Sequence, residues 1–118
     1  MAMAAEFDFA AFRTAFETGN AAAWAEFFAD DAEWLEYRHS DPPRSPNRIQ
    51  GRGAIAAFVE GVAAADLEIR IHDEVIGDER VAFAATIDLP DGRRVIEHVI
   101  LHVEDGRIRR QVDVEAWD

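Results

Sequence analysis

The hydrophobic spacing of the sequence changes at Leu67, from the helical period of about 3.6 residues to a period of two. Four alternating runs follow, at 67–76, 80–89, 93–103 and 107–117. The three junctions between these runs contain the Gly, Pro and Asp residues that form hairpin turns, so the runs predict an antiparallel four-stranded meander. A sheet of this kind needs helices from the first half of the chain to cover one of its faces.

Helical spacing is clear at the start of the sequence. Phe9, Phe12 and Phe16 recur at intervals of three and four residues, which places their rings on one stripe of a helix. Asp8 is suited to cap the first turn of this helix, and Gly19 is suited to end it. The pattern therefore predicts a first helix that is bounded by Asp8 and Gly19.

The rest of the first half predicts a second helix, a short strand, a loop and a third helix. Asn20 can cap the second helix, which ends at Asp30 and Asp31, and residues 32–37 follow as a strand. Residues 39–50 contain three prolines and predict an exposed loop without regular structure. Helical spacing returns between residues 51 and 65. With Arg38, Arg44 and Arg48 around it, the loop is expected to act as a basic lid or to pack on a partner subunit.

Two residue types are missing, and their absence limits the possible chemistry. All 12 cationic side chains are Arg, and there is no Cys. Schiff-base, pyridoxal-phosphate and Walker-type chemistry need a lysine amine, and thiol catalysis, thiolate metal sites and disulfides need Cys. A length of 118 residues predicts one domain over 1–118. We expect a cytoplasmic protein that needs no cofactor.

The net charge of −12 also limits the possible partners. Phosphate backbones and anionic lipid surfaces repel such a chain, so we expect neither nucleic acid nor membrane as a partner. The middle strands are apolar on both faces, with Phe83 and Ala85 on one face and Ala82 and Ala84 on the other. Helices can cover only one face, so the sequence predicts a homodimer that covers the second.

Four short motifs occur in a characteristic order along this pattern of elements. They are Gly19-Asn20, Ala-Asp-Asp-Ala at 29–32, Gly-Arg-Gly-Ala-Ile at 51–55 and Asp-Gly-Arg-Ile at 105–108. In these motifs and in its order of elements, the chain resembles the nuclear transport factor 2-like superfamily. This group includes ketosteroid isomerases, SnoaL-type polyketide cyclases and limonene epoxide hydrolases. The resemblance implies an α+β, cystatin-like fold, in which a cone-shaped antiparallel sheet wraps around the N-terminal helices and encloses an apolar pocket.

Two carboxyl groups stand where the resemblance implies catalytic residues. Glu36 takes the position of the isomerases' general-base Asp, and Asp113 matches an acid/base Asp on the last strand of the cyclases and hydrolases. A carboxyl group at the edge of an apolar pocket has a raised pKa and can carry a proton between two substrate carbons. For Glu36, the alternative is a solvated ion pair with Arg38 or Arg48. For Asp113, the alternative is that the strand face it shares with Glu115 points to solvent.

The resemblance also implies oxyanion donors, which this sequence lacks. Phe12 and Val99 stand at the positions of the two donors. In some family members, hydroxyl-bearing residues support one of these donors, and Phe28 and Val59 stand at their positions. One such donor typically contributes about 2.7 to 4 kcal/mol to the transition state. Efficient steroid isomerisation is therefore not expected. Epoxide hydrolysis is not expected either, because Asp113 is the one member of that triad present.

Among the four histidines, His98 is the candidate for a proton shuttle or a hydrogen bond in the pocket, because Glu97 stands beside it in the middle of a strand. The alternative is that His98 is satisfied within the sheet or at a dimer interface. His98 and His102 would lie roughly 13 Å apart along one strand, so no metal site is expected. Tyr37 could replace a lost donor only if a bulge turned it toward the face of Glu36. Trp24 and Trp34 are expected either in the core or against a ligand.

The sequence thus predicts a pocket protein for a small hydrophobic molecule. The candidate catalytic residues are Glu36, Asp113 and His98, and Glu97 is a further charge that a pocket could use. The candidate ligand-binding residues are Phe12, Trp24, Phe28, Trp34, Tyr37, Val59, Val99, Leu101, Glu115 and Trp117. The function is either cofactor-free isomerisation, cyclisation or hydration of a hydrophobic carbonyl compound, or ligand binding or dimerisation without catalysis.

Overall fold

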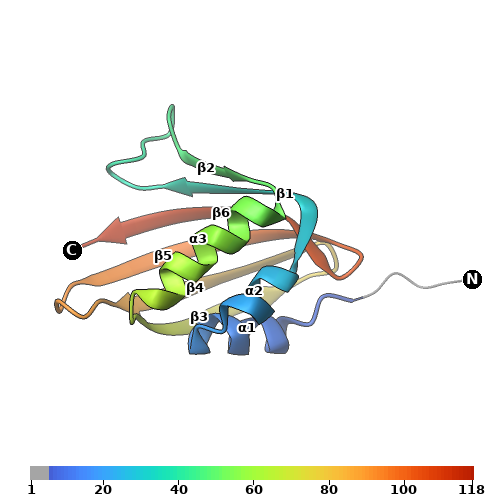
Figure 1. Ribbon diagram of the computed structural model, residues 1–118, viewed down its shortest axis with the longest axis horizontal. Helices are drawn as coiled ribbons and strands as arrows, with labels where there is room; N and C mark the ends of the chain where they lie inside the picture. The colour runs from blue at the N-terminus through green and yellow to red at the C-terminus, as the bar shows by residue number, and fades with distance from the viewer. Residues whose placement is uncertain (1–5) are drawn as a thin grey trace, which may run out of the picture.

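The computed structural model describes residues 6–118, which form an α+β fold with three helices packed against a six-stranded sheet. The helices are α1 (Phe9–Thr18), α2 (Ala21–Glu26) and α3 (Arg52–Ala64). The strands are β1 (Phe28–Tyr37), β2 (Asn47–Gln50), β3 (Glu68–Ile76), β4 (Arg80–Asp88), β5 (Arg94–Glu104) and β6 (Arg107–Trp117). Their order across the sheet is β2-β1-β6-β5-β4-β3, and all three helices lie on the same side (Figure 1).

The ends of the first helix are fixed by the residues expected to cap it. The Asp8 carboxylate accepts a hydrogen bond from the backbone N–H of Ala11 at 3.0 Å. Gly19 ends the helix with φ of 68°, a left-handed conformation that glycine adopts without a steric penalty. Asn20 then caps α2 by accepting a hydrogen bond from Ala23 at 3.2 Å. Local chemistry therefore sets the bend between the two helices.

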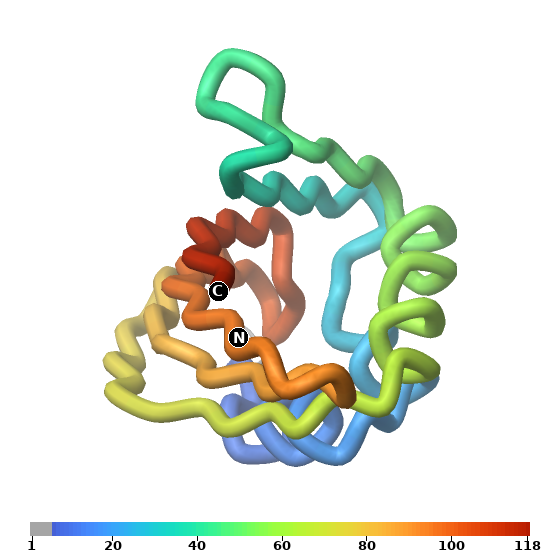
Figure 2. The backbone as a smooth tube through the Cα atoms, turned by 90° about the vertical axis from the view of Figure 1, so that its left-hand side faces the viewer, coloured from blue at the N-terminus to red at the C-terminus, as the bar shows by residue number. Residues whose placement is uncertain are grey.

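The predicted meander is confirmed, with strand ends that differ from the expected ones by at most one residue. Strands β3 to β6 pair in sequence order, and each neighbouring pair is antiparallel. Two bulges interrupt the ladders, one between His72 and Val75 and one between His102 and Val103. These bulges are consistent with the strong curvature of the sheet, which Figure 2 shows bending around the helices.

Three details of the first half differ from the sequence prediction. The second helix ends at Glu26, and Phe28 already begins β1, because the backbone N–H of Ile108 on β6 binds the carbonyl of Phe27 at 2.7 Å. Residues 47–50, expected to be part of an irregular loop, form the edge strand β2 against β1. The sheet is also mixed rather than purely antiparallel, since β1 runs parallel to β6.

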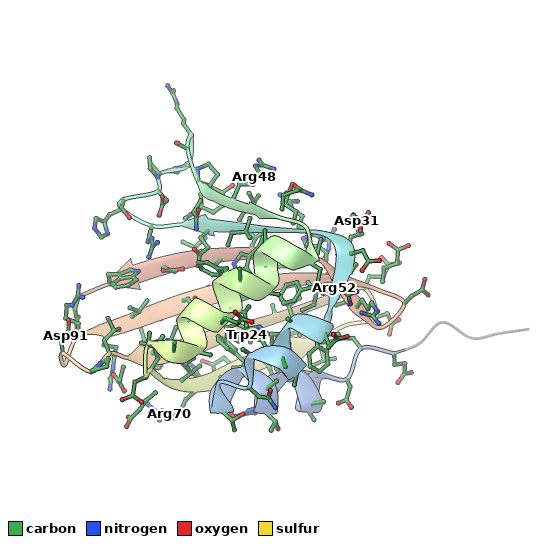
Figure 3. All side chains as sticks on the ribbon, viewed as in Figure 1. Trp24, Asp31, Arg48, Arg52, Arg70 and Asp91 are labelled. Carbon is green, nitrogen blue, oxygen red and sulfur yellow. The ribbon has the colours of Figure 1, made fainter. Side chains whose placement is uncertain are left out.

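The core lies between the helices and the concave face of the sheet. Its centre is an aromatic cluster in which Phe12 contacts five other phenylalanine rings at centroid distances of 5.6 to 6.3 Å. Trp24 of α2 also reaches into this layer, as Figure 3 shows. Among residues 6–118, no helix has the length and apolar character needed to cross a bilayer.

The position of Phe12 predicts its contribution to stability. Its side chain is 1% exposed, so Phe12→Ala leaves a large cavity and should lower the free energy of unfolding by about 3–5 kcal/mol. Phe12→Leu keeps more of the volume and should cost about 1.5 kcal/mol or less. Denaturant unfolding measures both values. Val75→Ala, at a side chain that is 68% exposed, is the control and should change the free energy by less than about 0.5 kcal/mol. Equal losses in Phe12→Ala and Val75→Ala would contradict this packing.

Candidate functional site

A cavity of about 560 Å³ lies between α3 and the concave face of the sheet. Its wall is mainly apolar and aromatic, with side chains from all three helices and from β1, β4, β5 and β6. The charged side chains in this wall are Glu36, Arg38, Glu97 and Glu115. The sheet therefore supplies carboxyl groups to a space whose opposite side, formed by α3, is apolar.

Glu36 points into this cavity from β1. Its side chain is 5% exposed, and Oε1 accepts a hydrogen bond from the Asn47 side-chain amide at 2.9 Å. Burial raises the pKa of Glu36 from 4.5 to about 7; the Asn47 bond opposes this shift, and the nearby Glu115 adds to it. Glu36 can therefore both accept and donate a proton close to neutral pH.

Asp113 lies next to Glu36 in the parallel register of β1 and β6, but it is fully buried behind the cavity wall. The Trp34 indole N–H donates to its Oδ2 at 2.8 Å, and the Gln111 amide donates to its Oδ1 at 3.0 Å. Burial raises the pKa of Asp113 well above its usual range, although the bond from Gln111 opposes this shift. Asp113 thus holds Trp34 in the wall and does not itself face the cavity.

Glu115 and Arg38 form the polar part of the cavity rim. Glu115 accepts a hydrogen bond from the Trp117 indole N–H at 2.8 Å, and its Oε1 lies 3.9 Å from the Arg38 guanidinium. The same guanidinium lies 5.4 Å from the centroid of the Trp117 ring and 2.7 Å from Asp41. The rim therefore combines a carboxylate, an indole face and a cation from the protein itself.

Glu97 stands opposite Glu115 in the antiparallel ladder of β5 and β6. Its side chain is 5% exposed and lines the cavity. Burial, and then the charges of Asp113 and Glu115, raise the pKa of Glu97 well above its ordinary value. Burial and the neighbouring carboxyl groups therefore disfavour the charged form of Glu97 when the cavity contains no compensating charge.

The structure brings four of the ten predicted ligand-binding residues to the cavity. Trp24, Trp34, Glu115 and Trp117 line it, together with Glu36. Phe12, Phe28, Val59, Val99 and Leu101 instead belong to the closely packed core, at exposures of at most 1%. Phe28 is kept from the cavity by Trp34, whose ring stacks on it at 5.7 Å. These five residues support the wall from behind.

His98 and Tyr37 lie on the opposite side of the sheet, which corrects their expected placement in the site. Neighbouring side chains on a strand point to opposite faces, so inward Glu97 places His98 outward, where it is exposed. Tyr37 follows inward Glu36 and is likewise outside the cavity wall. The bulge in β1 lies between Phe28 and Glu33, too early in the strand to turn Tyr37 inward.

The alternative ion pairs for Glu36 do not form. Arg48 pairs with Glu33 at 2.7 Å, and Arg38 pairs with Asp41 and Glu115. The loop before β2 extends beyond the sheet (Figures 1 and 2), and of its predicted basic residues only Arg38 lines the cavity. Within the described part of the chain, Glu36 is therefore held by an amide and not by a cation.

Three carboxyl groups are close enough together to share a metal ion. One ligand atom each from Glu36, Asp113 and Glu115 lies within 4.8 Å of the other two. Each of these groups, however, already accepts at least one hydrogen bond. Glu36 accepts from Asn47, and Glu115 accepts from Trp117. Asp113 accepts from both Trp34 and Gln111. A cation would have to compete with these donors for the carboxylate oxygens.

Several residues of the site were not identified from the sequence. Asn47 and Gln111 hold the carboxyl groups of Glu36 and Asp113, but their roles depend on pairings of β1 with β2 and β6 that the sequence pattern does not contain. Phe16 and Phe58 complete the aromatic wall. Their helical spacing predicts that both side chains face inward. It does not show whether they line a cavity or pack in a filled core.

The sequence of the chain matches one family model, that of the SnoaL-like domain, over residues 9–111. No curated protein matches the chain in sequence.

Solved structures of similar shape include proteins from several bacteria. A candidate ketosteroid isomerase from Kribbella flavida DSM 17836 has 20% sequence identity and a TM-score of 0.76, and the match covers 91% of this chain and 73% of that one. An NTF2-like protein of unknown function from Mesorhizobium loti has 20% identity, a TM-score of 0.79 and coverages of 89% and 84%. A candidate polyketide cyclase from Sinorhizobium meliloti has 22% identity, a TM-score of 0.69 and coverages of 86% and 88%. These similarities establish an NTF2-like fold.

The raised pKa of Glu36 predicts how stability depends on pH. A carboxyl group whose pKa is higher in the folded state takes up protons on folding, so its contribution to stability falls as pH rises from 4.5 to about 7. Glu36→Gln keeps an oxygen that can accept the Asn47 bond and removes this titration. At pH 8 the variant should be more stable than the unmodified chain by roughly 1–3 kcal/mol.

Denaturant unfolding at pH 5, 6, 7 and 8 measures this effect. Glu104→Gln, at an exposed position of β5, removes the same charge outside the cavity and should keep the pH dependence of the unmodified chain. If Glu36→Gln and Glu104→Gln show the same pH dependence, Glu36 does not titrate near neutrality.

Proposed function

The chain belongs to the SnoaL-like domain family, and from this premise we propose that it is a cofactor-independent acid/base enzyme. Its substrate is a small, largely apolar compound with a carbonyl group, and the reaction is an isomerisation, cyclisation or hydration. The observation that carries this proposal is Glu36, a buried carboxyl group in an apolar cavity wall with a pKa of about 7. A group with this pKa is present in both protonation states at neutral pH.

In this mechanism Glu36 removes a proton from the carbon next to the carbonyl group and returns it to another atom of the same substrate. The Asn47 amide fixes the direction of the carboxylate. Asp113 is a positioning residue, because it holds Trp34 and lies behind Glu36 without facing the cavity. The apolar wall keeps water away from the carboxylate, which strengthens it as a base.

The competing function is ligand binding without turnover. It is supported by Phe12 and Val99, which are buried apolar residues at the positions where the family resemblance implies oxyanion donors. Both functions use the same cavity, so an assay must separate binding of a small molecule from the removal of a proton.

The ring opening of 5-nitrobenzisoxazole makes this separation. A base removes the proton on C3, the C–H electrons form the nitrile, and the N–O bond breaks to give a cyanophenolate that absorbs visible light. Because only the carboxylate form of Glu36 is a base, the rate should rise with pH, with a midpoint near 7. Glu36→Gln should lower kcat/KM by about 100-fold or more.

Glu104→Gln is again the control and should retain the activity and pH profile of the unmodified chain. Unchanged turnover in Glu36→Gln would contradict the role of Glu36. Saturable binding of the compound without turnover in any variant would instead favour the non-catalytic binding module.

We also propose that the chain forms a homodimer through the outer face of β4, β5 and β6. Outward positions in the middle of these strands carry no carboxyl group, although the chain has 24 acidic residues. These residues are Ala82, Ala84, Thr86, Ile96, His98, Ile100, His102, Val112, Val114 and Ala116. Ile100 is 46% exposed and Val114 is 59% exposed. A second copy could cover this face without bringing like charges together.

Light scattering after gel filtration tests the homodimer. The unmodified chain should have twice the mass of one chain, and Ile100→Asp should have the mass of one chain, because the interface would have to bury a new, unpaired carboxylate. Ile76→Asp introduces the same charge at an exposed position on the end of β3 and should leave the dimer intact. A monomeric unmodified chain at micromolar concentration would disprove this interface.

A further inference from the structure

The charges in the cavity wall do not balance. Three carboxyl groups line the cavity, from Glu36, Glu97 and Glu115, and Arg38 is the only cationic side chain among the described residues of the wall. Asp113 adds a fourth carboxyl group directly behind the wall. Arg38 is itself shared between Glu115 and Asp41, which lies outside the cavity. Glu36 and Glu97 therefore form no ion pair with this cation.

Glu97 is the carboxyl group that lacks a partner of any kind. Across residues 6–118, no side chain or backbone group forms a hydrogen bond or ion pair with its carboxyl group, although Glu97 is only 5% exposed. Its position opposite Glu115 in the ladder directs it into the cavity. A largely buried carboxyl group without a protein partner is costly to the fold unless water, an ion or a ligand in the cavity interacts with it.

The rim shows which chemistry this wall accepts. There, the Arg38 guanidinium lies 3.9 Å from the Glu115 carboxylate and over the face of the Trp117 ring, 5.4 Å from its centroid. A second guanidinium, from Arg93, lies 5.6 Å from the same ring. Carboxylates and indole faces both attract cations, and the two attractions add when they act on one group. Of these two cations, Arg38 lines the same cavity wall as Glu97.

We propose that the ligand of this cavity carries a protonated amine, with its ammonium group against Glu97 and its apolar body against α3. The proposal rests on the proposed function, since it names the substrate class for the same cavity. An ammonium group supplies the hydrogen-bond donors and the positive charge that Glu97 lacks. The apolar body fits the wall formed by Phe58, Val62 and Leu67. Such a cation would also allow Glu97 to ionise, despite Asp113, Glu115 and Glu36 nearby.

Two ligands of nearly equal shape test this proposal directly. 1-Naphthylmethylamine is a cation at neutral pH, and 1-naphthalenemethanol is its neutral counterpart with a hydroxyl group that can also donate a hydrogen bond. Titration of each, followed by NMR of the tryptophan indole N–H signals, gives the two dissociation constants and reports binding beside Trp34 and Trp117. The amine should bind at least about tenfold more tightly than the alcohol.

Glu97→Gln should abolish this preference, while Glu104→Gln, which removes the same charge from an exposed part of the same strand, should retain it. Thermal unfolding by circular dichroism shows whether both variants are folded, and the ratio of affinities in the unmodified chain tests the proposal even if Glu97→Gln does not fold.

The outcomes separate this inference from the proposed function. Equal or tighter binding of the alcohol, or an amine preference that survives in Glu97→Gln, overturns the amine proposal; the acid/base function stands in that case if Glu36 still opens 5-nitrobenzisoxazole. Failure of both naphthyl ligands to shift the indole signals also overturns it. If 5-nitrobenzisoxazole is not bound either, the cavity does not bind small molecules and both proposals fail.

Discussion

The parallel pairing of β1 with β6 joins the first strand of the chain to the last, and the arrangement of the site depends on it. In this register Glu36 lies beside Asp113, and Trp34 lies beside Gln111. The hydrogen bond from Trp34 to Asp113 crosses the same pair of strands. Because side chains alternate along a strand, a slip of one residue would turn Glu36 away from the cavity and bring Leu35 or Tyr37 to its wall. One strand pair thus fixes which groups face the ligand space.

The carboxyl groups on this face differ in their surroundings rather than in their chemistry. Glu36 accepts a hydrogen bond from an amide, and Asp113 accepts one from an indole and one from an amide. Glu115 accepts a hydrogen bond from an indole and lies near a guanidinium. Glu97 has no such partner within the described part of the chain. Environments of this kind push the pKa values of similar groups apart and so give them different tasks. The cost to folding is a set of poorly solvated acids on one side of the sheet. The aromatic cluster around Phe12 provides compensating burial on the same side.

Local signals in the sequence predicted most of the fold. These signals are the helix caps at Asp8, Gly19 and Asn20, the change of period at Leu67 and the hairpin turns. Each depends on residues that are close together in the chain, so the sequence alone could predict the elements they define. The pairings of β1 with β2 and β6 could not, because they join distant segments and leave no local pattern. The same limit applies to the site. Alternation along β6 grouped Asp113 with Glu115, but only the three-dimensional structure shows that Asp113 lies behind the wall and that Glu97, not His98, faces the cavity.

The residues that line the cavity occupy two kinds of position, within strands and just outside strand ends. Glu36, Glu97 and Glu115 stand within strands whose neighbours fix their positions, whereas Arg38, Leu67 and Leu89 lie just outside the ends of β1, β3 and β4. Substitutions at these strand ends can change the size and polarity of the cavity without altering any strand pairing. In evolutionary terms, the range of molecules admitted can diverge while the proton-handling groups stay in place, so one scaffold can give rise to many specificities through changes at its margin.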